Sequence, residues 1–490
     1  MLSVDAATIG TATPAATTAA AGTTAAASEA RRVAVVGAGI TGLATAYLLS
    51  RERPAWQVAV LESGEHVGGK ARTTVRGGYT VDWGPNGFLT SAPETLELAR
   101  ALGLEDELQP AADAARHRFL YRDGGLRPLP ASPQAFLTSE VVPFPGRARA
   151  ALEPWLGSRG AGEESVHAFL ARHFGRGFAD ALADAFVSGI TAGDPRELSL
   201  DALFPRMRAM ERAHGSLVRA LVAQQRAARR RRREAGAGPR PPAPGRLTSF
   251  REGGMQRLLD ALADALPRPV RLGAAVTALE RAPDGPAYRL RLAGGEPEAF
   301  DAVVVTAPAP SAAGLLRPLA PSAADALAAI PYAGVRVFGL GFDRIDVPRV
   351  LDGFGVLVPR GQGVRSLGVL WTSTLYPGRA PAGKVLLRVL AGGRLDPAML
   401  ELSDDDALAA VRRDLRISMG VVAEPEFVET VRWPRAIPQY TLGHGARLSA
   451  LEAGLAGLPG LQLAGNAYRG VGVNDCVREA RRVVQALTGR

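Results

Sequence analysis

The part of the chain that is predicted to fold begins with short apolar runs separated by polar stretches. Residues 32–36 (RVAVV) and 57–61 (QVAVL) have the length and β-branched content of strands buried in a parallel sheet. Residues 43–50 lie between them and are predicted to form the connecting helix. Together the three segments predict a βαβ unit of about 30 residues.

A helical spacing of apolar residues replaces this pattern between residues 92 and 212. The apolar side chains recur three, four or eight positions apart, which places them on one face of a helix. They are Val166, Phe169, Leu170 and Phe174, followed by Phe178, Leu182 and Phe186. We therefore expect a largely α-helical middle domain.

Strand-like runs return in the second half of the chain. They are predicted at residues 302–306, 335–342 and 384–390, and the second alternates with period two. Residues 461–464 are predicted to form a last short strand, followed by a glycine-rich turn and a predicted helix over 475–487. The order of patterns predicts a fold of the α/β plus α+β kind, with no internal repeat.

The charge of the chain is concentrated in one place. Of the formal net charge of +10, the segment from Arg226 to Arg246 supplies eight arginines against Glu234 alone, a net of +7. Residues 213–246 are rich in Arg, Pro and Gly and are predicted to be a solvated loop. Anionic lipid, nucleic acid or a protein partner could bind such a run, but it lacks the interleaved aromatic residues that stack on bases, so nucleic acid is not expected.

Composition narrows the remaining possibilities. The 490 residues are 47% hydrophobic and 22% charged, which predicts two or three domains. The single cysteine, Cys476, excludes an intrachain disulfide framework and a cysteine-cluster metal site, and no metal is expected. Residues 1–30 are rich in Ala and Thr and are predicted to be a disordered tail. No run approaches the roughly 18 apolar residues of a spanning helix, so any membrane contact is expected to be peripheral.

The most informative motif is the glycine turn that follows the first predicted strand. Its first glycine permits a tight bend, its second lets a pyrophosphate approach the backbone, and its third lets the helix pack on the strand. The N-terminus of the helix then offers free N–H groups to the phosphates. Glu62 lies 20 residues beyond the turn, where a carboxylate can accept hydrogen bonds from ribose hydroxyls. The turn comprises Gly37, Ala38, Gly39, Ile40, Thr41 and Gly42.

A second glycine pair favours FAD over NAD as the dinucleotide. Gly68 and Gly69 precede Lys70, Ala71 and Arg72 just past the second strand, which adds backbone N–H groups and a guanidinium beside the same nucleotide. No other turn of the first type occurs in the chain, so a separate NAD(P)H site of that kind is not expected. An oxidase is therefore favoured over a reductase or monooxygenase.

Several longer motifs resemble the protoporphyrinogen oxidase family, within the monoamine-oxidase-like flavoproteins. The likeness extends from about residue 31 to the C-terminus. The matching strings are Gly68-Gly69 with Arg72, VDWGPNGF at 81–88, RFLY at 118–121, GITAGD at 189–194, IPQYTLGH at 437–444, LAGN at 463–466 and GVGVNDC at 470–476.

The resemblance implies a discontinuous Rossmann-like FAD-binding domain, a substrate domain and a helical domain that lies against a membrane. The expected FAD domain comprises 31–90, 247–300 and 433–490, the helical domain 91–212 and the substrate domain 301–432. The resemblance also implies a cytoplasmic protein peripherally bound to the cytoplasmic membrane, and a homodimer is possible within the family. Beyond the first turn, the flavin contacts it implies are Glu62, Ser63, Gly69, Lys70, Arg72, Gly84, Pro85, Asn86, Gly87, Val276, Trp433, Gly465, Gly470, Val471, Gly472 and Val473.

The family chemistry is a six-electron aromatisation of a porphyrinogen, in three hydride transfers to non-covalent FAD, each followed by reoxidation with dioxygen and release of peroxide. Such a reaction needs orientation and a dry flavin face more than an acid–base pair. Arg118 matches the arginine that meets a substrate propionate, and its planar fork suits a carboxylate. Asn86 is a candidate for polarising a pyrrole N–H, although an asparagine that forms a turn fits equally well. The apolar lining implied for the macrocycle comprises Phe354, Gly355, Leu357, Leu370 and Leu390.

Two further residues have competing interpretations. Cys476 could in principle carry a covalent flavin, but its Asn-Asp-Cys setting matches the non-covalent family, and a small buried thiol is the commoner outcome. His444 could act as a general base, but a structural histidine that orients the turn is favoured.

Three alternative functions remain open at this stage. An amine oxidase on the same scaffold commonly places a lysine near the flavin, but neither Lys70 nor Lys384 is well placed for that role. A coproporphyrinogen-oxidising enzyme would share fold and flavin and differ in the carboxylates of its substrate. A non-catalytic porphyrin-binding flavoprotein is a third possibility, against which the intact glycine turn, Glu62 and Arg118 argue.

Overall fold

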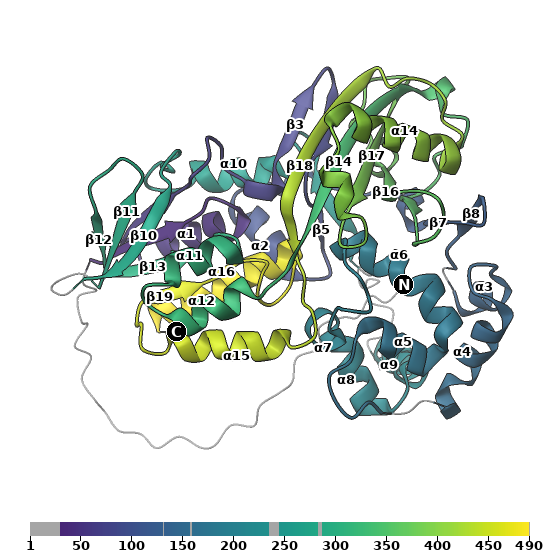
Figure 1. Cartoon of the computed structure of the whole chain (residues 1–490), viewed down its shortest axis with the longest axis horizontal. Coiled ribbons are helices and arrows are strands. Elements are labelled where there is room, and N and C mark those ends of the chain that lie inside the picture. The colour runs from purple at the N-terminus through teal and green to yellow at the C-terminus, as the bar shows by residue number, and fades with distance from the viewer. Residues whose placement is uncertain (1–29, 131, 157–158, 235–244, 283–286, 490) are drawn as a thin grey trace.

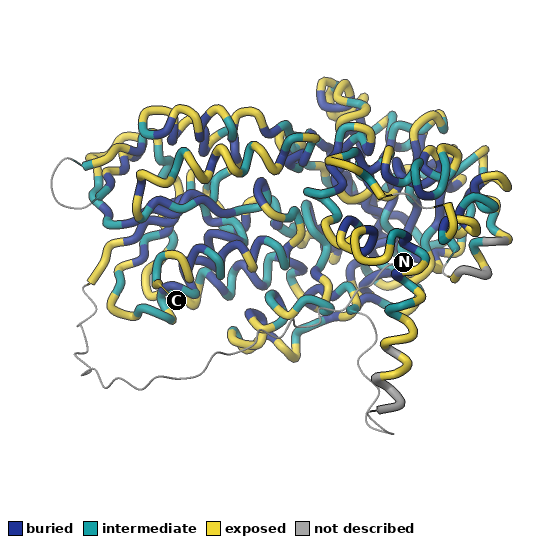
Figure 2. The backbone as a smooth tube through the Cα atoms, turned by 90° about the horizontal axis from the view of Figure 1, so that it is seen from below, coloured by how far each residue is buried: buried dark blue, intermediate teal, exposed yellow. Residues whose placement is uncertain are grey.

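The computed structural model describes residues 30–489, apart from residue 131 and the segments 157–158, 235–244 and 283–286. Figure 1 shows a part built around a parallel sheet, a second sheet beside it, and a cluster of helices below that second sheet. The part around the parallel sheet is called the nucleotide-binding part below, after the role that the sequence predicts for it. Buried residues follow the sheets and the helix faces turned toward them (Figure 2). The predicted tail, residues 1–30, lies almost entirely outside the described residues.

The parallel sheet has the strand order β19-β13-β1-β2. Its strands are β1 (Arg32–Val36), β2 (Gln57–Leu61), β13 (Ala302–Val305) and β19 (Leu461–Leu463). Val33 to Val36 pair with β13 on one side and with β2 on the other, and most of these side chains are buried. Strand β1 is therefore central, and the turn that follows it lies at the carboxyl edge of the sheet, where open α/β sheets bind ligands.

Helices and a small antiparallel sheet cover the two faces of this sheet. One face packs against α1 (Ile40–Glu52), α2 (Pro93–Ala101), α10 (Gln256–Asp264) and α16 (Val473–Thr488). The other packs against β10 (Val276–Arg281), β11 (Tyr288–Leu292), β12 (Glu298–Phe300), α11 (Ala309–Leu316), α12 (Pro321–Ala328) and α15 (His444–Leu455). This layered arrangement is the Rossmann-like domain that the sequence predicted.

The second sheet is mixed and has the order β18-β14-β17-β16-β15-β7-β8. Its strands are β7 (Phe119–Arg122), β8 (Gly125–Pro128), β14 (Tyr332–Asp343), β15 (Gly355–Leu357), β16 (Ser366–Trp371), β17 (Lys384–Gly392) and β18 (Phe427–Pro438). One face packs against α14 (Asp404–Met419), and part of the other packs against the hairpin of β3 (Thr73–Arg76) and β4 (Tyr79–Asp82). The hairpin lies between the second glycine pair and residues 83–87 in the chain, so it brings segments that the sequence predicts to contact the cofactor against the second sheet.

Shorter elements complete these two parts. Strands β5 (Phe88–Leu89), β6 (Leu108–Pro110) and β9 (Leu247–Phe250) form a small antiparallel sheet, and α13 (Thr372–Leu375) follows β16. Single 3-10 turns lie at Gly69–Ala71 (η1), Glu105–Glu107 (η2), Asp113–Arg116 (η3), Arg344–Asp346 (η4) and Pro397–Leu400 (η5).

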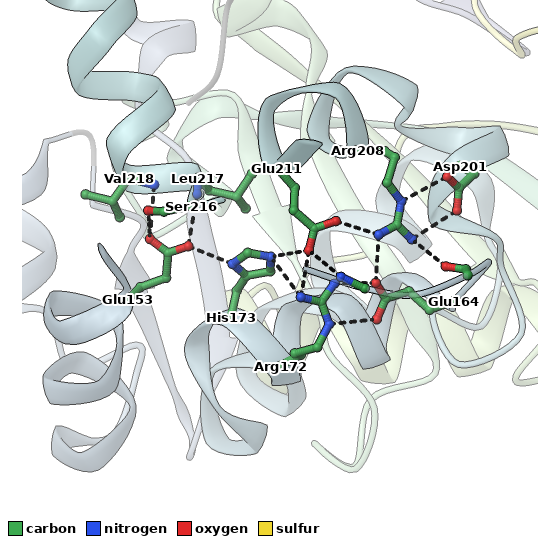
Figure 3. Close-up of polar contacts among 12 residues, drawn as sticks. Glu153, Glu164, Arg172, His173, Asp201, Arg208, Glu211, Ser216, Leu217 and Val218 are labelled. Carbon is green, nitrogen blue, oxygen red and sulfur yellow. Dashed lines mark hydrogen bonds and ion pairs between the residues drawn. The ribbon is translucent and has the colours of Figure 1, made fainter. Parts of the chain in front are cut away.

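The helical part consists of α3 (Pro133–Thr138), α4 (Phe144–Leu156), α5 (Val166–Phe174), α6 (Arg176–Thr191), α7 (Leu200–Leu203), α8 (Pro205–His214) and α9 (Leu217–Glu234). A network of ionisable groups, most of them buried, joins helices α4, α5, α7, α8 and α9 (Figure 3). Nδ1 of His173 lies 2.6 Å from Glu153 and its Nε2 lies 3.1 Å from Glu211, and all three side chains are almost fully buried.

Each carboxylate of the network has further donors. Glu211 also pairs with Arg172 and Arg208, each at 2.6 Å. Glu153 accepts hydrogen bonds from the backbone N–H groups of Leu217 and Val218, at the start of α9. Burial alone would raise the pKa of Glu211, but hydrogen bonds from Arg172, Arg208 and His173 outweigh it and lower that pKa to about 2. Because these groups are hydrogen-bonded to one another, we assign the network to the stability of the helical part.

The structure corrects the predicted domain boundaries. The segment 301–432 was assigned to the substrate domain, but β13, α11 and α12 belong to the nucleotide-binding part. Conversely, β7 and β8, from the predicted helical segment 91–212, pair into the second sheet, and the end of β18 (433–438) does too. A short buried strand has the same composition in either sheet, so local pattern does not decide which sheet it joins.

The predicted loop 213–246 was wrong for residues 217–234, which form α9. Leu217 and Ala220 are buried and continue the helical apolar face, and arginine is a good helix former. A run of cations at a helix C-terminus also complements the helix dipole. Arg226 and Arg229 are exposed, in agreement with the predicted solvation, and residues 235–244 lie outside the described part.

Candidate flavin and substrate site

The glycine turn after β1 has the geometry that its sequence predicted. Gly37 adopts φ +107°, a conformation that disfavours residues with a Cβ. A Cβ on Gly42 would lie 1.9 Å from the carbonyl oxygen of Gly37, so the helix can approach the turn only with glycine there. A Cβ on Gly39 would meet nothing within 4 Å, and α1 starts at Ile40 without a side-chain cap. The turn therefore offers open space and uncapped N–H groups, which is what a pyrophosphate needs.

Glu62 stands beside this turn at the end of β2. Its Oε2 accepts a hydrogen bond from the N–H of Ala38 at 2.7 Å, and its Oε1 accepts one from Gly64 at 2.8 Å. The exposed Ser63 hydroxyl lies 3.3 Å from the same carboxylate. Val276 starts β10 close by, since the N–H of Ala274 donates to the backbone carbonyl of Glu62. The carboxylate is thus fixed next to the turn.

The second glycine pair packs directly on the first turn. The N–H of Gly68 donates to the carbonyl of Ala38 at 2.8 Å, and a Cβ on Gly69 would lie 3.5 Å from the Cα of Gly39. Lys70 extends from η1 toward the second sheet, where its Nζ donates to the carbonyl of Ala436 at 2.7 Å. Burial lowers the pKa of Lys70 to about 8. Arg72 follows, and its carbonyl accepts from the N–H of Trp83.

The segment 83–87 joins the flavin side to the second sheet, and we call it the flavin loop. A Cβ on Gly84 would lie 2.0 Å from the carbonyl of Lys70, and one on Gly87 would lie 2.6 Å from both the carbonyl of Thr248 and the hydroxyl of Tyr376. Pro85 lies between these tight contacts. Within the described part of the chain, Nδ2 of Asn86 is buried without a hydrogen-bond partner, so this loop holds a donor that a bound ligand would satisfy.

Trp433 reaches the flavin loop from β18, where its Nε1 donates to the carbonyl of Trp83 at 3.3 Å. The C-terminal glycine segment closes the other end of the site. Gly465 and Gly470 adopt positive φ, and the N–H of Gly470 donates to the hydroxyl of Tyr440 at 2.8 Å. This segment also contains Val471, Gly472 and Val473, the residue at which α16 begins beside α1.

Cys476 and His444 occupy structural positions. Cys476 is buried against Thr41 of the glycine turn, and burial raises the pKa of its thiol to about 12. Nε2 of His444 lies 2.9 Å from the carbonyl oxygen of Tyr468, and its ring stacks on Tyr440 with centroids 4.1 Å apart. Tyr440 also accepts from the N–H of Gly470, so the contacts of His444 are those of a structural residue, in agreement with the favoured interpretation.

The predicted lining residues share one face of the second sheet. Gly355 pairs with Leu370, and Leu357 and Leu390 both pair with Gly368, so the side chains of Leu357, Leu370 and Leu390 point to the same side of the sheet. Phe354 and Leu370 pack with Tyr376, whose hydroxyl approaches Gly87 of the flavin loop. The lining face and the flavin loop therefore meet.

Arg118 lies at the edge of this face, just before β7. Its guanidinium carbon is 4.8 Å from the centroid of the Phe354 ring, and the described residues offer it no carboxylate partner. Burial lowers the pKa of Arg118. A half-buried guanidinium without a counter-ion suits an anionic ligand group.

The sequence did not single out Arg388, which lies on the same face. Its side chain is 4% exposed, and its Nη2 donates to the carbonyl of Gly84 at 2.6 Å. The only sequence signal is a charged residue in the middle of the apolar run VLLRVLAG, on a strand otherwise buried on both faces.

Comparison with known proteins identifies the family to which this chain belongs. The model of the flavin-containing amine oxidoreductase family matches residues 40–488. The chain belongs to this family, and family membership implies a flavin cofactor. The open glycine turn, the fixed Glu62 and the unpartnered Asn86 amide fit such a group.

Among curated proteins, similar relatives belong to two kinds of porphyrinogen oxidase. The chain is 35% identical to the chloroplastic protoporphyrinogen oxidase of rice (Oryza sativa subsp. japonica), over 91% of this chain and 86% of that protein. It is also 35% identical to the coproporphyrinogen III oxidase of Propionibacterium freudenreichii, over 91% and 89%. The Bacillus subtilis coproporphyrinogen III oxidase is 31% identical, over 94% and 98%.

Solved structures agree on the fold. A crystal structure from Exiguobacterium sp. 255-15 superposes with a TM-score of 0.80 at 27% identity, covering 93% of this chain and 98% of that one. Reduced UDP-galactopyranose mutase superposes with a TM-score of 0.71 at 16% identity, over 94% of each chain, and shows the fold alone. Within the described ranges, every helix is too short or too polar to cross a membrane.

Proposed function

We propose that this chain is an FAD-dependent oxidase that converts protoporphyrinogen IX to protoporphyrin IX. The relatives named above oxidise porphyrinogens according to their names, and they match this chain over nearly its whole length. When bound, the flavin accepts hydride from the macrocycle and passes the electrons to dioxygen. One observation carries the proposal: Arg118 has no counter-ion among the described residues and lies at the edge of a mainly apolar sheet face that meets the flavin loop.

In this account each part of the site has one task. Arg118 binds a propionate and fixes the register of the macrocycle. The face made by Phe354, Gly355, Leu357, Leu370 and Leu390 covers the ring and excludes water. Asn86 donates its free amide N–H to the occupant of the site. None of these groups needs to transfer a proton, because most of the rate acceleration would come from holding the substrate in the reactive position.

The choice of protoporphyrinogen over coproporphyrinogen rests on charge. Coproporphyrinogen has four propionates, whereas protoporphyrinogen has two of them and two vinyl groups. The predicted lining residues other than Arg118 are apolar, and the guanidinium of Arg388 on the same face is bonded to the carbonyl of Gly84. Such a face accommodates vinyl groups better than further carboxylates. Equal identity to both kinds of relative keeps coproporphyrinogen as the second candidate.

Non-covalent FAD and a substrate that is not an amine are part of the proposal. The thiol of Cys476 is buried with a raised pKa, so it is a poor nucleophile toward a flavin. Lys384 is bound by Asp343 at 2.9 Å and by Glu426 at 2.5 Å. Lys70 is bonded to Ala436. Neither lysine is therefore free for the role seen in amine oxidases.

The helical part supports peripheral membrane contact. Helix α4 exposes four large apolar side chains, of which Phe144 is 73% and Trp155 74% exposed; the other two are Leu152 and Leu156. Exposed aromatic and aliphatic groups on one helix suit a bilayer interface. Sedimentation with lipid vesicles should recover the protein, and the double variant Phe144→Ser/Trp155→Ser should stay in the supernatant.

Steady-state oxidation of the two porphyrinogens tests the substrate. Porphyrin fluorescence should rise with a higher kcat/KM for protoporphyrinogen IX than for coproporphyrinogen III under identical conditions. A higher value for coproporphyrinogen III would replace the first candidate by the second. Turnover of neither, by protein that contains FAD, would exclude both.

A further inference from the structure

Lys70, Arg118 and Arg388 lie around the site and have lowered pKa values, unlike the other lysine and arginine side chains whose pKa values are shifted. Burial lowers the pKa values of Lys70, Arg118 and Arg388, and within the described part of the chain no carboxylate forms an ion pair with any of them. The other cations with shifted pKa values have raised ones, because each is hydrogen-bonded to Asp or Glu side chains. They are Lys384, Arg172, Arg208, Arg257, Arg271, Arg360, Arg365, Arg394 and Arg478. The site therefore concentrates positive charge that forms no ion pair with a carboxylate within the described residues.

Arg388 is the most deeply buried of the three unneutralised cations. It lies on β17 opposite Leu370 of β16, and two positions before Leu390. Nε is buried without a hydrogen-bond partner among the described residues. The nearby carboxylate of Asp82 accepts from Thr73 and from the N–H of Met255 through Oδ1, and its Oδ2 lies 3.8 Å from Arg379, so it forms no ion pair with Arg388. Burial lowers the pKa of Arg388 to about 10, so the guanidinium stays charged at neutral pH.

The hydrogen bond that orients this guanidinium is made to the flavin loop. Nη2 donates to the carbonyl of Gly84, on the loop whose Asn86 amide is also without a partner. The side chain therefore links a strand of the lining face to the segment expected to contact the flavin. Burial of an unpaired cation costs free energy, and loss of the hydrogen bond to Gly84 would increase that cost further.

We propose that Arg388 is a positioning residue that holds the flavin loop against the substrate sheet and places a fixed positive charge at the loop that would contact the flavin. The proposal rests on the FAD binding proposed above, and not on the identity of the porphyrinogen. A hydride brings two electrons and one proton, so the neutral oxidised ring gains one negative charge when it accepts one. A nearby fixed cation stabilises that charged form and raises the reduction potential of the bound flavin.

The reduction potential of the holoenzyme tests this inference without any porphyrinogen. It is measured by slow reduction in the presence of a redox dye, for the wild type and for Arg388→Gln, Arg388→Met and Arg388→Lys. Removal of the charge in the Gln and Met variants should lower the equilibrium constant for reduction at least tenfold, which is about 30 mV for a two-electron couple. Arg388→Lys should retain most of the wild-type value, because it keeps the charge.

A matched control removes a buried arginine from the opposite face of the same sheet. Arg336 is 1% exposed and pairs with Asp404, at the start of α14. Arg336→Met should leave the potential unchanged. If Arg388→Met does not bind FAD, the comparison of the Gln and Lys variants decides the question.

Two results would overturn the inference. One is a wild-type potential in FAD-containing Arg388→Gln, and the other is an equal fall in the Gln and Lys variants. Either result would leave FAD binding and porphyrinogen turnover untouched, whereas protein that never binds FAD would refute the proposed function instead.

Discussion

The carboxylate of Glu62 accepts a hydrogen bond from the backbone N–H of Ala38 at 2.7 Å, which joins the end of β2 to the glycine turn after β1. The two residues are 24 positions apart, and the βαβ unit brings them together because β1 and β2 are adjacent parallel strands. The same carboxylate also accepts from Gly64. It is therefore held in place at the point where a ribose would follow the pyrophosphate.

Replacement of Glu62 should weaken FAD binding. A hydrogen bond to a charged group contributes about 1.5–3 kcal/mol, so Glu62→Ala should raise the Kd for FAD by roughly 10- to 150-fold. Flavin fluorescence during titration of the apoprotein measures this. The neighbouring exposed Glu65 serves as the control, and a Kd for Glu65→Ala equal to that of Glu62→Ala would contradict the assigned role.

Arg118 should govern substrate binding and not flavin binding. Arg118→Met removes a charge-assisted contact to a propionate, and kcat/KM should fall by about 10- to 100-fold while the Kd for FAD stays the same. Arg118→Lys should recover part of the loss, since it keeps the charge without the planar fork. Arg116→Met changes an exposed arginine on the same segment and should behave as wild type. Wild-type kinetics in Arg118→Met would remove the residue from the site.

Lys70 should make the stability of the apoprotein depend on alkaline pH. Its folded pKa of about 8 lies below its ordinary value of 10.5, so the unfolded chain holds more protons between these values. Stability should therefore rise with pH across this window, by up to about 3 kcal/mol at roughly 1.36 kcal/mol per pKa unit. Urea unfolding of wild type and Lys70→Met at about pH 7.5 and about pH 10.5, near the two ends of this window, measures the difference. An identical pH dependence in both proteins would show that Lys70 keeps its ordinary pKa.

Acid should loosen the helical part through Glu211. Its folded pKa of about 2 lies below the ordinary 4.5, so its contribution is complete above pH 4.5 and is lost as the pH falls from there toward 2. Glu211→Gln should destabilise the helical part by roughly 3–5 kcal/mol at neutral pH, because it leaves buried cations without their partner. Hydrogen exchange in α5 and α8 measures both effects. Glu197→Gln, in an exposed pair with Arg394, is the control, and equal exchange in the two variants would contradict the assignment.

Local patterns predicted the elements better than their grouping. The strand predicted at residues 57–61 matches β2, and the glycine turn, Glu62 and the second glycine pair meet as expected, because a βαβ unit is determined over a short stretch of chain. The placement of β13 in the parallel sheet depends on pairing between residues 33–36 and 302–305, which no local pattern encodes. Arg388 was missed for a related reason, since only the tertiary fold brings β17 to the carbonyl of Gly84.

Helix α9 shows a different limit. A run of arginines is typical of a solvated segment, and Arg226 and Arg229 are indeed exposed. Exposure does not exclude helix formation, because the preceding turn of α9 is buried and Glu153 caps its first N–H groups. The capping carboxylate comes from α4, 64 positions before Leu217 in the chain. Sequence spacing alone could not reveal that contact.

Rapid anaerobic mixing of the FAD-containing protein with protoporphyrinogen IX is the decisive test of the proposed oxidase activity. The absorption band of oxidised flavin should bleach as porphyrin fluorescence appears, and the band should return when oxygen is admitted. A flavin spectrum that stays unchanged on mixing, both with this substrate and with coproporphyrinogen III, would contradict it.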